Sequence, residues 1–441
     1  MNTPKPISWF YENLPEEQLI EDKFREIIKS NYSLSWFTPI DTPAIERLDT
    51  LLSKWWDDNE IYWVKRFKAD NITEFDIWLR FDLTVPLARY VSMYKWNLNF
   101  PFKVQNIWKS WRWERPQKWR YREFYQADID IIWDWYVPLF ADVEILSTIY
   151  NTLKGLEFWN FIININNKKL LEWFLQSLKI TKISEIIGVI DKKDKVKSII
   201  PMLEDLFLNK EQINKILELL KFSDKKDWLE NLLFFENIDN ELLKEGILEL
   251  KYIYNTLLKS WIKEEFLKIN PAISRGLNYY TWLVFETFIV WKENMWSISS
   301  WWRYENLCSN FSKDSFPWVG WSIWLSRLLS VLKDIWLIEM DKKTTSMVLV
   351  LNTEEDLLLK NLEITNNLRK KWIKSELYLD SDAKFSKQLK YANNKKIPYV
   401  LIYWNEEAKK WVVKLKILSS WEQKEIKIED ITSYIENILK K

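Results

Sequence analysis

The residues best suited to chemistry lie in one arginine-rich stretch, Arg112–Asp130 (RWERPQKWRYREFYQADID). Four arginines fall within eleven residues, and two glutamates lie beside them: Arg112, Arg115, Arg120, Arg122, Glu114 and Glu123. A guanidinium fork suits phosphate, while a carboxylate beside an amide suits an amine and a polar ring. The stretch indicates a site for a phosphorylated substrate, although a solvent-facing hairpin with salt bridges would show the same composition.

A β-hairpin is the element predicted to position these side chains. Alternation at period two is typical of strands, and the break at Pro116–Trp119 predicts the loop of an antiparallel pair. On the returning strand, successive residues point to opposite faces. One face is predicted to carry Gln126, Asp128 and Asp130, and the other Tyr125, Ala127, Ile129 and Ile131.

The chain contains no histidine. This excludes Ser–His and Cys–His nucleophile systems, imidazole metal sites and histidine general bases. Phosphoryl or adenylyl transfer remains, because it depends on positioning and charge neutralisation more than on proton shuttling.

Bulk composition predicts a cytoplasmic protein of about three domains. The 441 residues include 64 basic and 63 acidic ones, so no global charge draws the chain to nucleic acid or membrane. The single Cys308 excludes a disulfide framework and fits a reducing compartment. The N-terminus has no apolar signal region, and no apolar run is long enough to span a membrane.

Periodicity predicts the elements around the hairpin. Residues 16–35 have helical spacing, and an extended, proline-containing segment follows Trp36. Residues 165–260 are rich in Leu, Ile, Lys and Glu and predict a mainly helical insertion; helices packed on the main domain as core are the alternative. From Thr344, strand and helix patterns alternate, which predicts an α/β domain.

Three further stretches hold candidate site residues. Leu79–Tyr90 is predicted to be extended, with Asp82 and Thr84 on one face. The other two stretches are ISRGLNYYTWLVFE, with Arg275, Tyr279 and Tyr280, and VGWSIWLSRLL, with Arg327. A strand end and a core tyrosine pair are the simpler interpretations of the first two.

These stretches resemble one protein family. The hairpin resembles motif 2 of class II aminoacyl-tRNA synthetases, in the histidyl-tRNA synthetase form R-x-E-R-P-Q-x-G-R-Y-R-E-F. LRFDLT resembles the family's amino-group motif, SRGLNYYTW its histidine signature with Asn278 for the commoner aspartate, and VGWSIWLSRLL its motif 3. SSWWRYENL (Ser299–Leu307) also matches G-G-R-Y-[DE]-x-L.

The resemblance implies an α+β class II synthetase catalytic core with an antiparallel sheet, a helical insertion, and a C-terminal α/β anticodon-binding domain. The predicted limits are 1–164 and 261–338 for the two parts of the core, 165–260 for the insertion and 344–441 for the anticodon-binding domain. Motif 1, with Pro43, would form a homodimer interface.

The implied reaction is histidine–tRNA ligation. L-Histidine and ATP, with Mg²⁺, would form histidyl-adenylate, and the histidyl group would pass to the 3′ end of tRNA(His). The resemblance assigns ATP binding to Arg112, Glu114, Arg120 and Arg327. It assigns histidine binding to Asp82, Thr84, Arg112, Gln126, Asp130, Arg275, Tyr279 and Tyr280. Arg112 and Arg275 are the predicted catalytic residues, and no metal ligand is assigned.

The alternative from another class is the regulatory paralogue of ATP phosphoribosyltransferase, a histidine sensor on the same core. That paralogue lacks the C-terminal domain and has lost the ATP-binding arginines, whereas this chain contains both.

Tryptophan is abundant where glycine is expected. The chain has 30 tryptophans and 5 glycines, and the two together reach an ordinary glycine content. Tryptophan replaces the family's glycine at Trp119, Trp282, Trp301, Trp302, Trp321 and Trp324. Trp372, Trp404 and Trp421 occupy cap and turn contexts that favour positive φ. A truly tryptophan-rich protein and a deliberate design are alternatives; the sequence favours a genetic code in which UGA specifies glycine, with UGA rendered as tryptophan.

Overall fold

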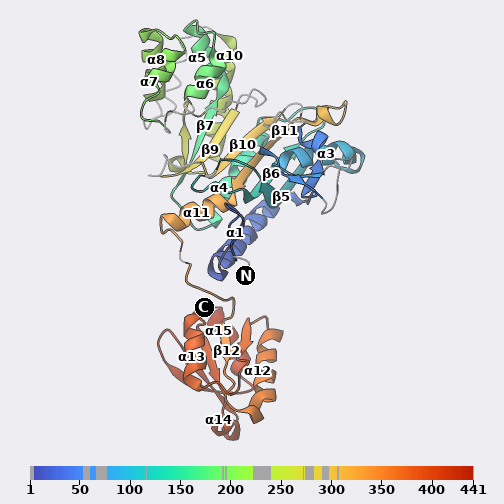
Figure 1. Cartoon of the computed structure of the whole chain (residues 1–441), viewed down its shortest axis with the longest axis vertical. Helices are drawn as coiled ribbons and strands as arrows, with labels where there is room; N and C mark the ends of the chain where they lie inside the picture. Colours follow the sequence, from blue (N-terminus) through green and yellow to red (C-terminus); the bar gives the residue numbers. More distant parts are fainter. Residues whose placement is uncertain are drawn as a thin grey trace. The chain divides into compact units, whose positions relative to one another are not determined.

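The computed structural model describes most of the chain as two compact units (Figure 1). The first unit comprises Met1–Tyr11 and Phe24–Leu337, and the second comprises Glu12–Lys23 and Ile338–Lys441. The described residues are 4–52, 60–65, 77–115, 117–190, 193, 196–221, 240–271, 273, 283–290, 297–304, 307–338 and 340–440.

An eight-stranded sheet forms the centre of the first unit, in the order β1-β5-β6-β11-β10-β9-β7-β8. The strands are β1 Thr38–Pro39, β5 Phe102–Trp111, β6 Glu123–Ile132, β7 Phe161–Asn167, β8 Leu267–Ile269, β9 Leu283–Ile289, β10 Ser299–Tyr304 and β11 Trp318–Trp324. The strands from β5 across to β7 pair antiparallel, which confirms the predicted antiparallel core. The outer strands β1 and β8 run parallel to their neighbours.

Alternation along the strands gives this sheet two different faces. Ala127, Ile129 and Ile131 of β6 are buried on an apolar face, against which helix α4 (Phe140–Gly155) packs. The opposite face has a polar side chain at the same level of six adjacent strands. In order across the sheet these are Asn106, Asp128, Ser322, Ser300, Glu286 and Asn164, which we call the polar row. This face therefore suits a polar ligand.

Helix α3 (Thr84–Tyr94) covers one end of the polar face. Its Leu87 and Val91 join Val104 and Trp318 in an apolar cluster. The prediction of an extended stretch through Asp82 and Thr84 is wrong here, because helix α3 begins at Thr84. The Asp82 carboxylate accepts a hydrogen bond from the Val85 N–H at 2.9 Å, so it caps the first turn instead of continuing a strand.

The hairpin of β5 and β6 is confirmed, but its loop is longer than the predicted break at residues 116–119. Strand pairing ends at Trp111 opposite Glu123. The N–H of Arg122 then bonds the carbonyl of Trp9 instead of the facing strand. One further bond, from the Arg112 N–H to the Arg122 carbonyl, closes the pair. The described residues between these two form a loop whose side chains can gather around a ligand.

Smaller elements flank the sheet. A three-stranded sheet, in the order β2-β4-β3, precedes α3. The elements before and beside the main sheet are α1 Pro15–Leu34, β2 Ile45–Arg47, α2 Leu48–Leu51, β3 Trp63–Val64, β4 Ile77–Leu79, η3 Lys95–Asn97, η6 Glu264–Phe266, η7 Leu307–Asn310 and α11 Leu325–Asp334. The predicted helix over 16–35 corresponds to α1.

Helices dominate the chain between β7 and β8. They are α5 Lys168–Ser177, α6 Ile183–Ile190, α7 Ile200–Asp205, α8 Lys210–Lys221 and α10 Glu241–Lys259. Helix α10 packs on α5 and also reaches α4 and β7, so this segment is joined to the sheet through α10. None of the helices in the described part of the chain is long and apolar enough to cross a membrane.

The second unit has the predicted alternation of strand and helix. Its sheet has the order β13-β12-β14-β15-β16, with the first three strands parallel and the last two antiparallel. The elements are β12 Val348–Val350, η8 Glu355–Leu357, α12 Leu358–Lys370, β13 Ser375–Leu377, α13 Phe385–Asn394, β14 Tyr399–Ile402, α14 Asn405–Lys410, β15 Val412–Ile417, β16 Gln423–Lys427 and α15 Ile431–Leu439. Apolar residues of α12 and α15 pack on one face, and those of α13 on the other.

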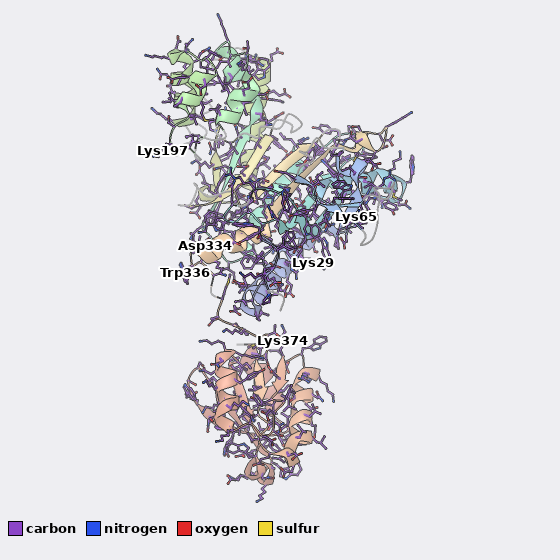
Figure 2. The ribbon with its side chains drawn as sticks, viewed as in Figure 1. Lys29, Lys65, Lys197, Asp334, Trp336 and Lys374 are labelled. Carbon is purple, nitrogen blue, oxygen red and sulfur yellow. The ribbon has the colours of Figure 1, made fainter. Side chains whose placement is uncertain are left out.

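Tryptophan occupies most of the left-handed backbone positions. Among the described residues, twelve non-glycine residues have positive φ and no glycine does. Eight of them are tryptophan: Trp9, Trp36, Trp119, Trp261, Trp336, Trp372, Trp411 and Trp421. Trp336 follows α11 and is 91% exposed (Figure 2). The prediction that Trp404 lies in a turn favouring positive φ is wrong, because Trp404 is an extended N-cap residue with a φ of −109°.

Candidate active site

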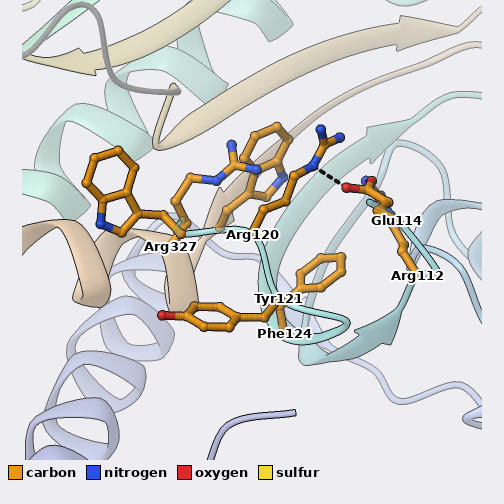
Figure 3. Close-up of a pocket in the computed structure, with 8 residues that line it drawn as sticks. Arg112, Glu114, Arg120, Tyr121, Phe124 and Arg327 are labelled. Carbon is orange, nitrogen blue, oxygen red and sulfur yellow. Dashed lines mark ion pairs between the residues drawn. The ribbon is translucent and has the colours of Figure 1, made fainter. Parts of the chain in front are cut away.

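One pocket collects side chains from the hairpin loop and from the junction of β11 with α11 (Figure 3). Its lining residues are Arg112, Glu114, Trp119, Arg120, Tyr121, Phe124, Trp324 and Arg327. All four residues predicted to bind ATP lie among them, although Arg327 is distant from the hairpin in sequence. The fold therefore brings these four together.

Glu114 lies between two arginines in this pocket. Its Oε1 is 3.5 Å from Nη1 of Arg112, and its Oε2 forms an ion pair with Nε of Arg120 (Figure 3). The carboxylate is largely buried, so the two guanidinium groups replace much of its hydration. Two guanidinium groups converging on one carboxylate are also placed to bind the oxygens of a phosphate chain.

The Arg112 guanidinium is held from two sides. Its Nε donates to the carbonyl of Phe81 at 3.1 Å. Its central carbon lies 4.4 Å from the ring centre of Phe81 and 5.2 Å from that of Phe124. A guanidinium placed over aromatic faces is both attracted and oriented. Arg112 is therefore pre-organised before any ligand arrives.

Arg327 is paired with an indole. Its Nη1 donates to the carbonyl of Ser297 at 2.9 Å, and its guanidinium carbon lies 3.7 Å from the ring centre of Trp324. The indole of Trp119 bonds Oδ2 of Asp334 at 2.5 Å. The Trp324 indole therefore covers one face of the Arg327 guanidinium, so a planar base could not stack on that face.

Gln126 and Asp130 lie on the polar face of β6, on either side of Asp128. Asp130 and Gln126 are each 2% exposed. The Gln126 Nε2 donates to Oγ of Ser322 at 3.3 Å, and Trp324 lies opposite Gln126 in the ladder. Gln126, one of the residues predicted to bind histidine, therefore pairs with a residue that lines the arginine pocket.

Two buried acidic side chains, Asp128 and Asp130, lie beside each other on the polar face of β6. Burial raises the pKa of Tyr32 well above its usual value of 10, and the charges of Asp128 and Asp130 raise it further. The Tyr32 hydroxyl donates to the carbonyl of Ala127 at 3.0 Å, so it lies beside β6. Burial disfavours any charge at this place, whereas the contribution from Asp128 and Asp130 would by itself favour a cation such as an ammonium group.

Asp82 and Thr84 lie at the start of α3, and each is 3% exposed. Asp82 directly follows Phe81, whose carbonyl holds Arg112. These two residues are therefore connected to the arginine pocket through the backbone. Arg275, Tyr279 and Tyr280 lie in 274–282, outside the described residues.

The sequence patterns did not identify every residue of this region. Tyr121 and Phe124 line the pocket, and Arg80, which directly precedes Phe81, is completely buried. Phe124 could have been found, because it lies two residues before Gln126 on the same strand face. Arg80 gave no signal, because a charged residue in a strand pattern is usually exposed.

Within the described residues, no group of three or more acidic, histidine or cysteine side chains is placed to hold a metal ion. Mg²⁺ commonly binds through one or two carboxylates together with substrate phosphates. The carboxylate that lines this pocket, Glu114, is already paired with Arg112 and Arg120.

Comparisons with known proteins point to one family. The family model for histidyl-tRNA synthetase matches residues 10–328, and the model for an anticodon binding domain matches residues 345–438. A histidine–tRNA ligase of Clostridium tetani is 37% identical over 437 residues, covering 98% of each chain. One from Helicobacter pylori is 35% identical over 429 residues, covering 95% of each.

Solved structures of similar fold point to the same family. The histidyl-tRNA synthetase of Nostoc sp. superposes with a TM-score of 0.88 at 31% identity, covering 99% of this chain and 100% of that one. An ATP phosphoribosyltransferase regulatory subunit/histidyl-tRNA synthetase of Bacillus halodurans has a TM-score of 0.71 at 18% identity, covering 88% and 97%. The second likeness shows only a shared fold.

Proposed function

The chain belongs to the histidyl-tRNA synthetase family, and we propose how its residues divide the work of that reaction. As a class II histidine–tRNA ligase it activates histidine with ATP and esterifies tRNA. The regulatory paralogue is not favoured, because relatives that align over nearly the whole chain are ligases and the anticodon binding domain is present.

For ATP, we assign the phosphates to arginines. Arg112 neutralises the α-phosphate, Arg120 holds the terminal phosphates in a bent conformation, and Arg327 stacks on adenine and reaches the γ-phosphate. Glu114 accepts from the adenine amino group. The shared pocket of these residues supports the assignment. ATP binding must then displace Glu114 from its ion pair with Arg120.

For histidine, we assign a pocket on the polar face. Asp82 and Thr84 bind the α-amino group, and Tyr279 and Tyr280 line the imidazole pocket. Gln126 and Asp130 complete the pocket, with Asp130 near the imidazole or the amine. Arg275 contacts both the substrate carboxylate and the α-phosphate. The burial of Asp82, Gln126 and Asp130 supports the first part, and the acidic side chains of Asp128 and Asp130 on β6 suit a cationic amine.

The chemistry needs charge neutralisation and alignment. An oxygen of the histidine carboxylate attacks the α-phosphorus, the bond from that phosphorus to the bridging oxygen breaks, and pyrophosphate leaves. Mg²⁺, when bound, neutralises charge on the phosphates. Fixed guanidinium groups stabilise the charge that develops in the transition state, and the carboxylate nucleophile needs no protein base.

The remaining partners are also proposals. The tRNA would be tRNA(His), and the segment around Pro43 would contact a second subunit. We propose a catalytic core in two parts, 1–164 and 261–338, a helical insertion at 165–260 and an anticodon-binding domain at 344–441. The lone cysteine, Cys308, is buried and unpaired, which supports a reducing, cytoplasmic setting.

The convergence of Arg112, Glu114, Arg120 and Arg327 in one pocket is the observation that carries these assignments. Histidine should drive ATP–pyrophosphate exchange, while phenylalanine, glutamine and proline should not. A site that hydrogen-bonds a polar ring rejects analogues lacking those partners by about 10⁴ or more. Faster exchange with another amino acid would refute the histidine pocket.

We also propose that UGA specifies glycine in this gene and that tryptophans at these codons are native glycines. Support comes from four helix ends. In each case a tryptophan just after the helix has a left-handed backbone conformation and is at least 85% exposed: Trp36, Trp261, Trp336 and Trp372. At Trp372, the N–H bonds the carbonyl of Arg369 and the next N–H bonds that of Leu368, the pattern that favours glycine.

The same helix ending occurs without glycine at Lys179 and Lys396, so the conformation alone does not require glycine. The family motifs add the second support, since the Trp324 indole covers a face of Arg327, the residue that we assign to adenine stacking. Mass spectrometry of the natural protein should show glycine at Trp119, Trp301, Trp302 and Trp324. Indole at these positions in an active native enzyme would refute the proposal. Below, the glycine form is the chain translated with UGA as glycine.

A further inference from the structure

Arg80 is a buried cation that none of the assignments above uses. Its side chain has no exposure, and Asp41, the carboxylate within ion-pairing distance in the described chain, is 4.0 Å away and 63% exposed. Burial lowers the pKa of the guanidinium to about 10, against the opposing effect of Asp41. A poorly neutralised buried charge is costly unless hydrogen bonds compensate.

The compensating hydrogen bonds join two separate segments. On one side, Nη1 donates to the carbonyl of Thr42 at 2.7 Å and approaches its Oγ1 at 3.3 Å. On the other side, Nε donates to the carbonyl of Lys109, in β5, at 2.9 Å. One planar guanidinium thus spans the gap between the segment at Thr42 and the end of β5.

The backbone of Arg80 joins the same two segments. Its N–H donates to the carbonyl of Ala44 at 2.9 Å, and its carbonyl accepts from the N–H of Trp111 at 3.2 Å. Side chain and main chain therefore repeat one connection. This places Arg80 as a bridge rather than as filler of an apolar space.

The bridge leads directly to Arg112. The residue after Arg80 is Phe81, whose carbonyl accepts from Nε of Arg112 at 3.1 Å and whose ring lies under the same guanidinium. Arg112 in turn follows Trp111, which Arg80 also binds. A displacement of Arg80 would therefore move the Phe81 carbonyl that binds the Arg112 guanidinium. It would also move the backbone at Trp111, from which Arg112 continues.

We propose that Arg80 is a positioning residue that couples the segment Asp41–Ala44 to the guanidinium of Arg112. The inference rests on the proposed role of Arg112 at the α-phosphate. Because Pro43 lies in the segment proposed for the subunit contact, the bridge provides a route from that contact to the reacting phosphate. Lysine cannot replace the arginine fully, since an ammonium group is a point donor and not a planar fork.

The test measures histidine-dependent ATP–pyrophosphate exchange in the glycine form with Arg80→Lys, Arg112→Lys and the double variant. Small misplacement of a catalytic group costs up to about 10²-fold in rate. We expect Arg80→Lys to lower kcat by roughly 10- to 10²-fold, with the KM for histidine unchanged. In the Arg112→Lys background, the same change should lower kcat little further, because residues that act through one another are not additive.

Arg89→Lys is the matched control. Arg89 is a partly buried arginine on α3 whose Nε lies 3.0 and 2.9 Å from the two carboxylate oxygens of Glu46, and this pair ties α3 to β2. We expect kcat to be unchanged by Arg89→Lys in either background. Thermal unfolding of every variant gives the folded fraction by which the rates are corrected.

Two results would overturn the inference. One is an equal fold-loss from Arg80→Lys in both backgrounds, and the other is a loss fully explained by the folded fraction. The proposed function fails separately: if Arg112→Lys alone leaves kcat unchanged, the role assigned to Arg112 is wrong whatever Arg80 does.

Discussion

At the scale of single residues, the site depends on charges held in place before substrate arrives. Arg112 is oriented by one carbonyl and two aromatic rings, and Glu114 occupies the position between it and Arg120. Side chains fixed in this way need little reorganisation when charge develops in the transition state. Replacing an arginine that lines the pocket should therefore slow adenylate formation far more than replacing a neighbouring arginine that does not.

Arg112→Ala and Arg115→Ala make the clearest pair. Arg112 lines the pocket, whereas Arg115 lies on the same loop, is exposed and does not line it. In the glycine form, Arg112→Ala should lower the rate of adenylate formation by about 10²–10³. Arg115→Ala should leave it within about twofold, as for most surface substitutions. Similar losses in pyrophosphate exchange would show that loop charge, not position, matters.

A second residue-scale prediction concerns Asp142 in α4. Its carboxylate is buried and lies 2.5 Å from the Arg303 guanidinium of β10. Burial raises its pKa from an ordinary 3.8 to about 6, although Arg303 acts in the opposite direction. The folded protein therefore keeps the proton between about pH 4 and 6 while the unfolded chain loses it.

The stabilisation from this proton is fully present below about pH 4 and is lost as the pH rises through about 6. Relative to Asp142→Asn, the wild-type free energy of unfolding should fall by about 3 kcal/mol across that range. Denaturant unfolding of both proteins at several pH values measures the difference. A difference independent of pH would contradict the prediction.

At the scale of elements, several helices end at a tryptophan whose backbone conformation is one that glycine adopts more easily. Trp372 closes α12 with φ of 59° and is 93% exposed, so its indole gains no burial in return for a left-handed backbone. A left-handed residue with a side chain costs about 1–2 kcal/mol. The strain lies in the backbone, and glycine would relieve it.

In the chain with tryptophan, Trp372→Gly should raise the free energy of unfolding by about 1 kcal/mol. Trp96→Gly is the control, because Trp96 is 88% exposed but lies inside η3 without positive φ. Glycine there should give no gain and should cost up to about 1 kcal/mol. Calorimetry of the two full-length variants would contradict the strain argument if both changes stabilised equally.

At the scale of the whole molecule, the two units have separate sheets and separate apolar cores. A chain ending at Leu337 should keep histidine-dependent pyrophosphate exchange. Aminoacylation of tRNA should fall by at least about 10²-fold, because the second unit matches an anticodon binding domain and a second linked contact would strengthen tRNA binding. Both reactions should be measured on one preparation. Equal loss of both would show that the first unit does not function alone.

The sequence by itself determined the family, the antiparallel core, the alternation in the second unit and four of the pocket residues. These depend on local spacing: alternation at period two assigns Gln126 and Asp130 to one face of β6 wherever that strand is placed. The motif residues Arg112, Glu114, Arg120 and Arg327 were likewise recognisable one segment at a time.

Only the tertiary structure decided the rest. The Asp82 stretch has a strand-like pattern, yet it caps α3, since the packing of Leu87 and Val91 on the sheet outweighs local preference. The long hairpin loop depends on the bond from Arg122 to Trp9, and the role of Arg80 depends on Thr42 and Lys109. Such contacts join residues far apart in the chain, so no local pattern records them; they exist only when the folded backbone brings the segments together.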